Sequence, residues 1–335
     1  MRKLYLQIPS GNKAKEDIDR IMEREGFVNV AWSLRSHNAV ARFVSKLVSV
    51  LLLAVRVRKG DIVLVQYPFK KYYELMCRLT HMKGGRVVTI IHDLGSFRRK
   101  KLTVAQENTR LMHTDVLIVH NEAMQQFLVD NGFTKPIVTL GIFDYLAPTP
   151  GQTPVKTASD EWQVVYAGGL AKRKNTFLYL LDEHISGWHF NIHGRGLDEE
   201  YTVGWKNITP RGFIASDDFI RSSVGHFGLV WDGSSIDECA GDWGVYLKVN
   251  NPHKTSFYLR SGKPVIMWRQ AALAPFVERE GVGFAVDSLR EIGERLASIT
   301  PEVYEQICQR ASIVSQRLAC GHYFCEAFRK ASEFL

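Results

Sequence analysis

The stretch Asn250–Trp268, NNPHKTSFYLRSGKPVIMW, places residues that suit anion binding at the start of a predicted helix. Pro252 fits the first helical position, because its missing N–H would have no partner there. Asn251, Lys254 and Thr255 surround that start. An open helix N-terminus carries about half a positive charge, and Lys254 reinforces it, so the stretch predicts a phosphate site. The alternative is an ordinary capped helix with a surface lysine.

A glycine pair with basic residues follows a second strand. Gly168 and Gly169 end the predicted strand Gln163–Ala167, and Lys172 and Arg173 come next. Glycine lets backbone N–H groups approach a phosphate closely, and the basic residues supply charge. The alternative is a tight turn. No Walker loop and no Gly-x-Gly-x-x-Gly occurs, so the sequence gives no support to ordinary dinucleotide binding.

Acidic and basic residues lie between a third strand and the helix start. Asp232 ends the segment FGLVWDG, and Asp242 and Lys248 follow it. A loop in this position is well placed to touch the ligand that the helix start would hold. The sequence does not rank the three residues.

In the first half of the chain, His92 and Asp93 end the buried segment VVTIIHD. A carboxylate or imidazole there can accept a proton as a general base, with Asp93 as the first candidate and His92 as the second. The alternative is that Asp93 caps the next helix. Gly11, Asn12 and Lys13 follow the first predicted strand and are expected at the same ligand site.

The sequence predicts no metal site. Its five cysteines are odd in number and scattered, with no Cys-x-x-Cys pair and no spacing suited to zinc, so we interpret them as reduced thiols in a cytosol. Asp17 and Asp19 form an Asp-x-Asp pair, but they lie in a predicted helix rather than at a strand end. We therefore do not assign them to metal or nucleotide binding.

The elements that position these residues alternate between strands and helices, which predicts an α/β fold. The expected architecture is two Rossmann-like, doubly wound domains, residues 1–146 and 162–300, facing each other across a cleft. A linker is predicted at residues 147–161. A C-terminal helix that crosses back to the first domain is predicted at residues 301–335. The expected strands are Lys3–Ile8, Asp61–Gln66, Arg86–His92, Asp115–His120, Ile137–Ile142, Gln163–Ala167, Trp188–His193, Gly225–Trp231, Pro264–Trp268 and Gly283–Val286.

The bulk composition indicates a globular protein with acidic partners. The 335 residues are 45% hydrophobic and carry a net charge of +8, which favours nucleotide phosphates or an anionic membrane face. Nucleic acid is disfavoured, because the basic residues cluster at strand ends. No segment has the roughly 18 apolar residues of a transmembrane helix, and the N-terminus is too short and polar for a signal peptide. Phe43–Val57 predicts either a buried helix or one that lies on a membrane surface.

Four segments carry a family resemblance that spans nearly the whole chain. They are IFDYL (142–146), YAGGL (166–170), FGLVWDG (227–233) and YLKVNNPHKTSFYL (246–259). The chain resembles bacterial β-1,6-galactofuranosyltransferases of O-antigen and surface-polysaccharide synthesis, which have the GT-B fold. More distantly, it is similar to glucosyltransferases that extend glycans on bacterial adhesins.

The resemblance implies transfer of galactofuranose from UDP-galactofuranose to a glycan hydroxyl, with a glucoside as the expected acceptor. It implies inversion at the anomeric carbon and no cofactor or bound metal. It also implies that residues 1–146 form the acceptor side and that 162–300 bind the nucleotide sugar. From the distant relatives it implies that Lys254 and either Lys172 or Arg173 hold UDP, and that the loop Gly11–Lys13 closes over it. It also suggests a cytoplasmic enzyme that visits the membrane for a lipid-linked acceptor, and homo-oligomerisation is left open. The alternatives are a UDP-glucose-dependent glucosyltransferase and a non-catalytic protein that binds nucleotide sugars or glycans.

Overall fold

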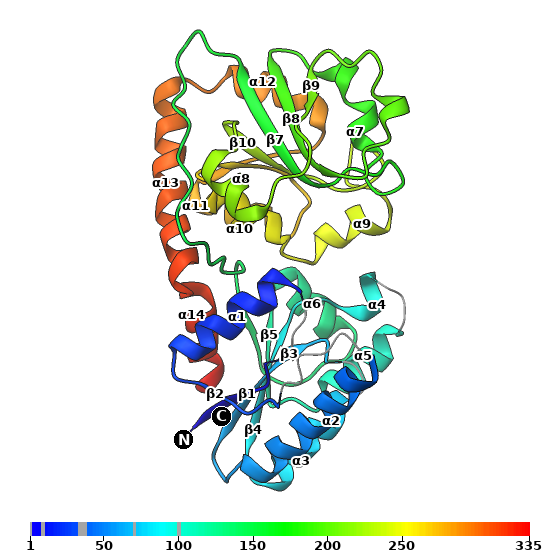
Figure 1. Cartoon of the computed structure of the whole chain (residues 1–335), viewed down its shortest axis with the longest axis vertical. Helices are drawn as coiled ribbons and strands as arrows, with labels where there is room; N and C mark the ends of the chain where they lie inside the picture. The colour runs from blue at the N-terminus through cyan, green and yellow to red at the C-terminus, as the bar shows by residue number, and fades with distance from the viewer. Residues whose placement is uncertain (1, 8–10, 33–38, 70–71, 99–101) are drawn as a thin grey trace. The chain divides into compact units, whose positions relative to one another are not determined.

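The computed structural model describes residues 2–7, 11–32, 39–69, 72–98 and 102–335. The chain forms two compact units: unit 1 contains the residues up to Leu140 together with Gly321–Leu335, and unit 2 contains Gly141–Cys320. Each unit is built on one six-stranded sheet, and every strand pairing is parallel (Figure 1). The predicted α/β fold with parallel sheets is therefore confirmed.

The sheet of unit 1 has the strand order β2-β1-β3-β4-β5-β6. Its strands are β1 (Lys3–Tyr5), β2 (Val28–Asn29), β3 (Ile62–Tyr67), β4 (Arg86–Ile91), β5 (Val116–Val119) and β6 (Ile137–Thr139). Its helices are α1 (Lys13–Arg24), α2 (Ala39–Arg56), α3 (Tyr73–Met82), α4 (Gly95–Arg98), α5 (Val104–Leu111), α6 (Glu122–Asp130) and α14 (His322–Ser332).

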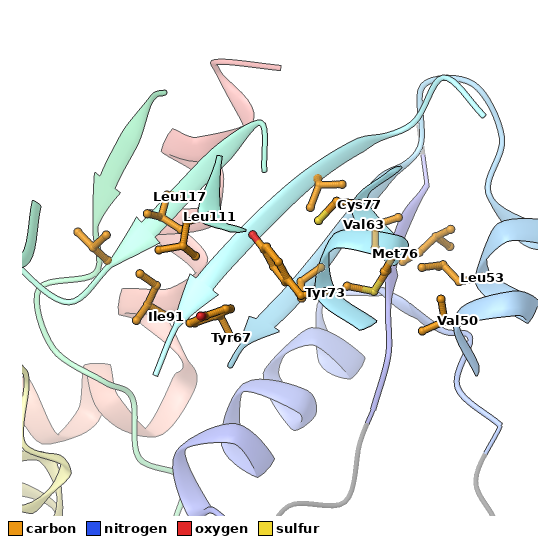
Figure 2. Close-up of a cluster of buried hydrophobic side chains, with 14 of the residues drawn as sticks. Val50, Leu53, Val63, Tyr67, Tyr73, Met76, Cys77, Ile91, Leu111 and Leu117 are labelled. Atoms are coloured by element: carbon orange, nitrogen blue, oxygen red, sulfur yellow. The ribbon is translucent and has the colours of Figure 1, made fainter. Parts of the chain in front are cut away.

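Both faces of this sheet are buried. Val63 of β3 lies in one buried cluster with Leu53 of α2 and Tyr73 of α3 (Figure 2), and Val65 belongs to the same cluster. Leu64 is also buried, although its side chain points to the opposite face. Near-continuous apolar strands are typical of parallel sheets covered on two sides, and this pattern made the strands recognisable in the sequence.

The sheet of unit 2 has the strand order β12-β11-β10-β7-β8-β9. Its strands are β7 (Trp162–Gly169), β8 (Trp188–Arg195), β9 (Ile208–Pro210), β10 (Phe227–Val230), β11 (Val265–Trp268) and β12 (Gly283–Val286). Its α-helices are α7 (Phe177–Leu180), α8 (Ser216–Ser222), α9 (Gly241–Val245), α10 (His253–Arg260), α11 (Ala274–Glu280), α12 (Ile292–Ala297) and α13 (Pro301–Cys320).

The structure corrects three sequence-based expectations. Strand β1 ends at Tyr5 rather than Ile8, and Ile8 lies outside the described residues. Two short edge strands, β2 and β9, have no clear sequence signal. The single helix expected over 301–335 is two helices, because Gly321 adopts a left-handed conformation with φ 83° and ends the run. Helix α13 belongs to unit 2 and α14 to unit 1.

Residues 147–161 contain no helix or strand, and part of this segment packs against the end of α10. The amide of Gly151 donates to the carbonyl of Arg260 at 2.8 Å. The buried guanidinium of Arg260 donates in turn to the carbonyl and hydroxyl oxygens of Ser315 on α13, at 3.1 and 3.0 Å. These bonds fix the C-terminal end of α10, and with it the direction in which its N-terminus points.

Helix α2 contains most of the apolar segment Phe43–Val57, for which the sequence predicts either a buried helix or one that lies on a membrane surface. Val50 and Leu53 are fully buried, but Leu51 is 51% exposed and Val55 is 78% exposed. The helix therefore has one apolar face in the core and further apolar side chains in contact with solvent. Among the described residues, no helix is long and apolar enough to cross a membrane.

Candidate active site

Helix α10 presents an open N-terminus in unit 2. Pro252 is its N-cap residue and has no side-chain group that could cap the backbone amides of the first turn, of which the Thr255 amide donates to the Pro252 carbonyl at 3.0 Å. The hydroxyl of Thr255, in that turn, is fully buried and has no hydrogen-bond partner among the described residues. The helix is held to the sheet by Tyr258, whose hydroxyl accepts the amide of Ala167 at 2.7 Å. The predicted helix start is therefore confirmed to within one residue, since Pro252 is the N-cap rather than the first helical residue. The Lys254 amide and the Thr255 hydroxyl at this start are able to bind an anion.

Lys254 forms the centre of a polar cluster beside this helix start. Its Nζ donates to the Tyr166 hydroxyl at 2.8 Å and to Asp232 Oδ1 at 3.0 Å, and the Tyr166 hydroxyl donates to the same carboxylate oxygen at 3.2 Å. Burial lowers the pKa of Lys254, while the Asp232 carboxylate opposes that shift. An ammonium has three donors, and the described residues accept two of them, so one remains for a ligand.

The two glycines at the end of β7 have different surroundings. A Cβ on Gly168 would lie 3.3 Å from the Nζ of Lys254 and 3.2 Å from the Tyr166 hydroxyl. A Cβ on Gly169 would meet nothing closer than the Cδ of Lys174, at 3.9 Å. Gly168 is thus the glycine that lies against the Lys254 cluster, where a larger side chain would press on the ammonium.

Asn175 connects the parts of the cluster, and sequence reasoning did not identify it. Its Nδ2 donates to the Tyr166 hydroxyl at 3.0 Å and to the Gly169 carbonyl at 2.7 Å. Its Oδ1 accepts the amide of Gly233 at 3.4 Å, directly after Asp232. The residue is fully buried. It lies one residue before Thr176, the N-cap of α7, and the local sequence offers no signal for this tertiary role.

The basic residues after β7 separate into different environments. Lys172 has its Nζ 3.1 Å from the centre of the Tyr201 ring, and Arg173 is exposed. Lys174 lies close enough to Lys254 for its charge to lower the pKa of that lysine, and its Nζ is 4.8 Å from the centre of the Trp243 ring. Of the three, Lys174 is the one whose charge acts on the cluster.

The other residues of unit 2 that the sequence predicted for the site are exposed or have partners outside the Lys254 cluster. The Nζ of Lys248 lies 5.3 Å from the centre of the Trp268 ring. The Nδ2 of Asn251 donates to the Gly141 carbonyl at 2.9 Å. Asp242 is exposed on α9. Of Asp232, Asp242 and Lys248, which the sequence could not rank, Asp232 is the one bonded to Lys254.

In unit 1, His92 and Asp93 follow β4 directly. His92 is buried, and its Nε2 lies 2.7 Å from Oε1 of Gln66, whereas Asp93 is partly exposed. The amides of Gly95 and Ser96, at the start of α4, donate to the carboxylate of Glu107 at 2.8 and 2.9 Å. Glu107 therefore caps the start of this helix. Capping the same helix was the alternative role that the sequence left open for Asp93.

The loop at residues 11–13 starts helix α1. Gly11 is exposed with φ 60°, and the side chain of Asn12 accepts the amide of Lys15 as an N-cap. Lys13 forms an ion pair with Asp17, four residues along the helix. Asn12 and Lys13 therefore both have local partners in the structure.

Solved structures show which class of protein has this fold. The chain matches the lipopolysaccharide outer core galactosyltransferase WaaB in its apo form, with TM-score 0.60 and 11% identity over 99% of each chain. It matches Anabaena Alr3699/HepE in complex with UDP, with TM-score 0.61 and 10% identity over 99% of this chain and 100% of that one. These likenesses, with the two parallel six-stranded sheets, define the fold as that of the GT-B glycosyltransferases.

Sequence comparisons identify the family. Residues 5–142 match the glucosyltransferase 3-like N-terminal domain, and residues 164–331 match the glucosyltransferase 3-like C-terminal domain. The chain belongs to this glucosyltransferase 3-like family and is a glycosyltransferase.

Two curated relatives match most of the chain. The β-1,6-galactofuranosyltransferase WbbI of Escherichia coli (strain K12) is 32% identical over 82% of this chain and 80% of that protein. Glucosyltransferase 3 of Streptococcus gordonii is 23% identical over 79% of this chain and 77% of that protein. Both resemblances expected from the four sequence segments are therefore confirmed.

Proposed function

We propose that this glycosyltransferase moves galactofuranose from UDP-galactofuranose to a hydroxyl of a glycan acceptor, a glucoside, in bacterial surface-polysaccharide assembly. The observation that carries the donor site is the Lys254 cluster beside the start of α10, where a cation, the positive end of a helix and the Thr255 hydroxyl suit a diphosphate. The 32% identity with a galactofuranosyltransferase, against 23% with a glucosyltransferase, favours galactofuranose as the sugar.

The proposed reaction is a single in-line displacement with inversion. The acceptor oxygen attacks the anomeric carbon, the bond from that carbon to the diphosphate oxygen breaks, and UDP leaves with the bonding electrons. Negative charge grows on the diphosphate, where the Lys254 ammonium and the amides at the start of α10 stabilise it; preorganised groups of this kind contribute several kcal/mol. The proton of the acceptor hydroxyl passes to a base, for which Asp93 and His92 are the candidates.

Metal independence is part of this proposal. Lys254 supplies the positive charge that a divalent cation would otherwise bring to a leaving diphosphate, with Lys174 acting on the same cluster. Addition of a chelator should therefore leave turnover unchanged.

The experiment that tests the donor compares UDP-galactofuranose with UDP-glucose on a panel of alkyl glucosides and N-acetylglucosaminides. UDP release is measured with and without a chelator. Release that needs UDP-galactofuranose and survives the chelator supports the proposal. Release from UDP-glucose alone would replace it with the glucosyltransferase function that the family name and the Streptococcus relative favour. Binding of UDP without any release would favour a non-catalytic binding protein.

We also propose that the acceptor is lipid-linked and that α2 brings unit 1 to an anionic membrane face. Leu51 and Val55 expose apolar surface on this helix, and Arg56 and Arg58 at its C-terminal end are exposed cations. An apolar strip edged by basic residues suits the boundary between anionic headgroups and acyl chains.

Replacing Arg56 and Arg58 by glutamine is expected to weaken binding to vesicles that contain phosphatidylglycerol by about thirty-fold, because each cation near such a surface contributes about 1 kcal/mol. Vesicle co-sedimentation measures the effect. The matched control replaces Arg20 and Arg24, two exposed cations of α1, by glutamine and should bind as the wild type does. Equal vesicle binding by both double variants would disprove the proposal that α2 contacts the membrane.

A further inference from the structure

The carboxylate of Asp232 is held through only one of its two oxygens. Its Oδ1 accepts the Tyr166 hydroxyl at 3.2 Å and the Lys254 ammonium at 3.0 Å. Its Oδ2 accepts no hydrogen bond from the described residues, and the side chain of Asp232 is 17% exposed. Because each carboxylate oxygen accepts about two hydrogen bonds, Oδ2 is available to a ligand.

The backbone around Asp232 is closely packed. A Cβ on Gly244 of α9 would lie 2.8 Å from the carbonyl oxygen of Asp232, and a Cβ on Gly233 would lie 2.2 Å from the carbonyl oxygen of Ala240. The Gly233 amide also donates to Oδ1 of the buried Asn175 at 3.4 Å. These contacts hold the residue in place, and the two bonds to Oδ1 orient its carboxylate. The direction of Oδ2 is therefore fixed before a ligand binds.

Lys254 and Asp232 present opposite charges to one ligand. The Lys254 ammonium has one donor left, which suits a phosphate oxygen. A carboxylate oxygen repels phosphate and accepts only from a donor such as a hydroxyl. In a nucleotide sugar the diphosphate joins two sugars, the ribose and the sugar to be transferred, and both carry hydroxyls. A nucleotide sugar with its diphosphate at Lys254 therefore brings hydroxyls to the neighbourhood of Asp232.

We propose that Asp232 binds a sugar hydroxyl of the donor through Oδ2 while Lys254 binds the diphosphate. This rests on the proposed function and adds to its donor site a residue that distinguishes a nucleotide sugar from a bare diphosphate. All the residues involved belong to unit 2. A carboxylate that served only to hold Lys254 would affect every diphosphate ligand alike, and this difference allows a test.

The test measures the binding of ligands with and without hydroxyls to Asp232→Asn. The variant keeps the shape of the side chain, but a neutral amide forms a weaker hydrogen bond than a carboxylate does. Calorimetry gives Kd for inorganic pyrophosphate, UDP, UDP-galactofuranose and UDP-glucose. Pyrophosphate has no hydroxyl and should bind as well or more tightly, because a negative charge near it is removed. Relative to pyrophosphate, at least one of the nucleotides should bind about ten-fold more weakly than to wild type.

The pattern of losses identifies the sugar. A loss shared equally by UDP and both UDP-sugars assigns the hydroxyl to ribose, and a loss confined to a UDP-sugar assigns it to the transferred sugar. The matched control is Asp217→Asn, which removes an exposed carboxylate of unit 2 and should leave every Kd unchanged. Thermal unfolding checks that both variants are folded. Equal changes for pyrophosphate and all three nucleotides would overturn the proposal, because Asp232 would then act only through Lys254.

Ligands that lack single hydroxyls give a second measurement. Deoxy analogues of UDP and of the UDP-sugars are titrated against wild type and Asp232→Asn. One analogue should bind wild type about ten-fold more weakly than its parent and lose less than two-fold more in the variant, since both changes remove the same hydrogen bond. Losses that add for every analogue would show that no hydroxyl contacts Asp232.

The binding data also separate this proposal from the proposed function. If wild type binds UDP but turns over neither donor, catalysis fails while the titrations still decide the role of Asp232. If wild type binds neither pyrophosphate nor any of the nucleotides, the donor site is wrong and both proposals are overturned.

Discussion

Replacing Lys254 by alanine is expected to lower the kcat for UDP release by about 10² to 10³-fold, the loss typical of removing one preorganised charge-stabilising donor. The Nζ of Lys254 contacts Tyr166 and Asp232 beside the open start of α10, where charge on the departing diphosphate would develop. The variant also leaves the Asp232 carboxylate without its cation, which adds repulsion against an anionic ligand. Steady-state assays with saturating donor measure the effect.

A matched control separates this local loss from a general change of charge. Lys206→Ala removes the same charge from an exposed position of unit 2 and should keep wild-type kcat and KM. Thermal unfolding of both variants shows whether the fold persists. A Lys254→Ala protein that is folded and turns over within about three-fold of wild type would remove Lys254 from the reaction.

Changing Asn175 to aspartate is expected to destabilise the protein by about 3 kcal/mol at neutral pH and to abolish donor binding. The side chain keeps its shape, but it loses the donors that reach Tyr166 and the Gly169 carbonyl. It also brings a carboxylate against that carbonyl in a fully buried position, where an uncompensated charge costs several kcal/mol. The loss should shrink as the pH falls, because a buried carboxylate takes up a proton.

Urea unfolding at pH 5 and pH 8 measures this change in the free energy of unfolding. Gln152→Glu is the control, since it also converts an amide to a carboxylate in unit 2, at an exposed position. It should shift the unfolding free energy by less than about 0.5 kcal/mol. If Asn175→Asp were as stable as this control at both pH values, the hydrogen bonds around Tyr166 would not hold the site together.

The donor-side residues that local sequence predicted share one property: each sits at a strand end or helix start that its neighbours define. Pro252 marks the start of α10, and the Gly168–Gly169 pair marks the end of β7, so Lys254 could be placed before any tertiary contact was known. Asn175 and Gln66 could not be placed in this way. Their roles depend on partners 47 or 58 residues distant, Asp19 and Gly233, and nothing in their own segments encodes those pairings.

Asp19 has a tertiary partner that its place in a helix does not by itself indicate. Its position inside a predicted helix argued against metal or nucleotide binding, since ligand-binding residues of doubly wound sheets follow the strands. In the structure its side chain reaches from α1 to Gln66 on β3, and from there the bonds continue to His92. A buried acid on the sheet-facing side of an amphipathic helix was the available signal.

The fold itself was largely predictable, because ten of the strands are apolar runs between helical segments. The two short edge strands, β2 and β9, were missed since two or three residues give no periodic pattern. The division of the final helix depends on Gly321. A Cβ there would meet Ile21 of α1 at 2.8 Å, so the glycine is required by packing as well as by its backbone conformation.

The measurement that tests the central claim most directly is a crystal structure of this chain with UDP. The account predicts diphosphate oxygens within about 3 Å of the Nζ of Lys254 and of backbone amides in the first turn of α10, with the Thr255 hydroxyl directed toward them. A diphosphate bound elsewhere, with Lys254 still contacting only Tyr166 and Asp232, would contradict the assignment of this cluster as the donor site.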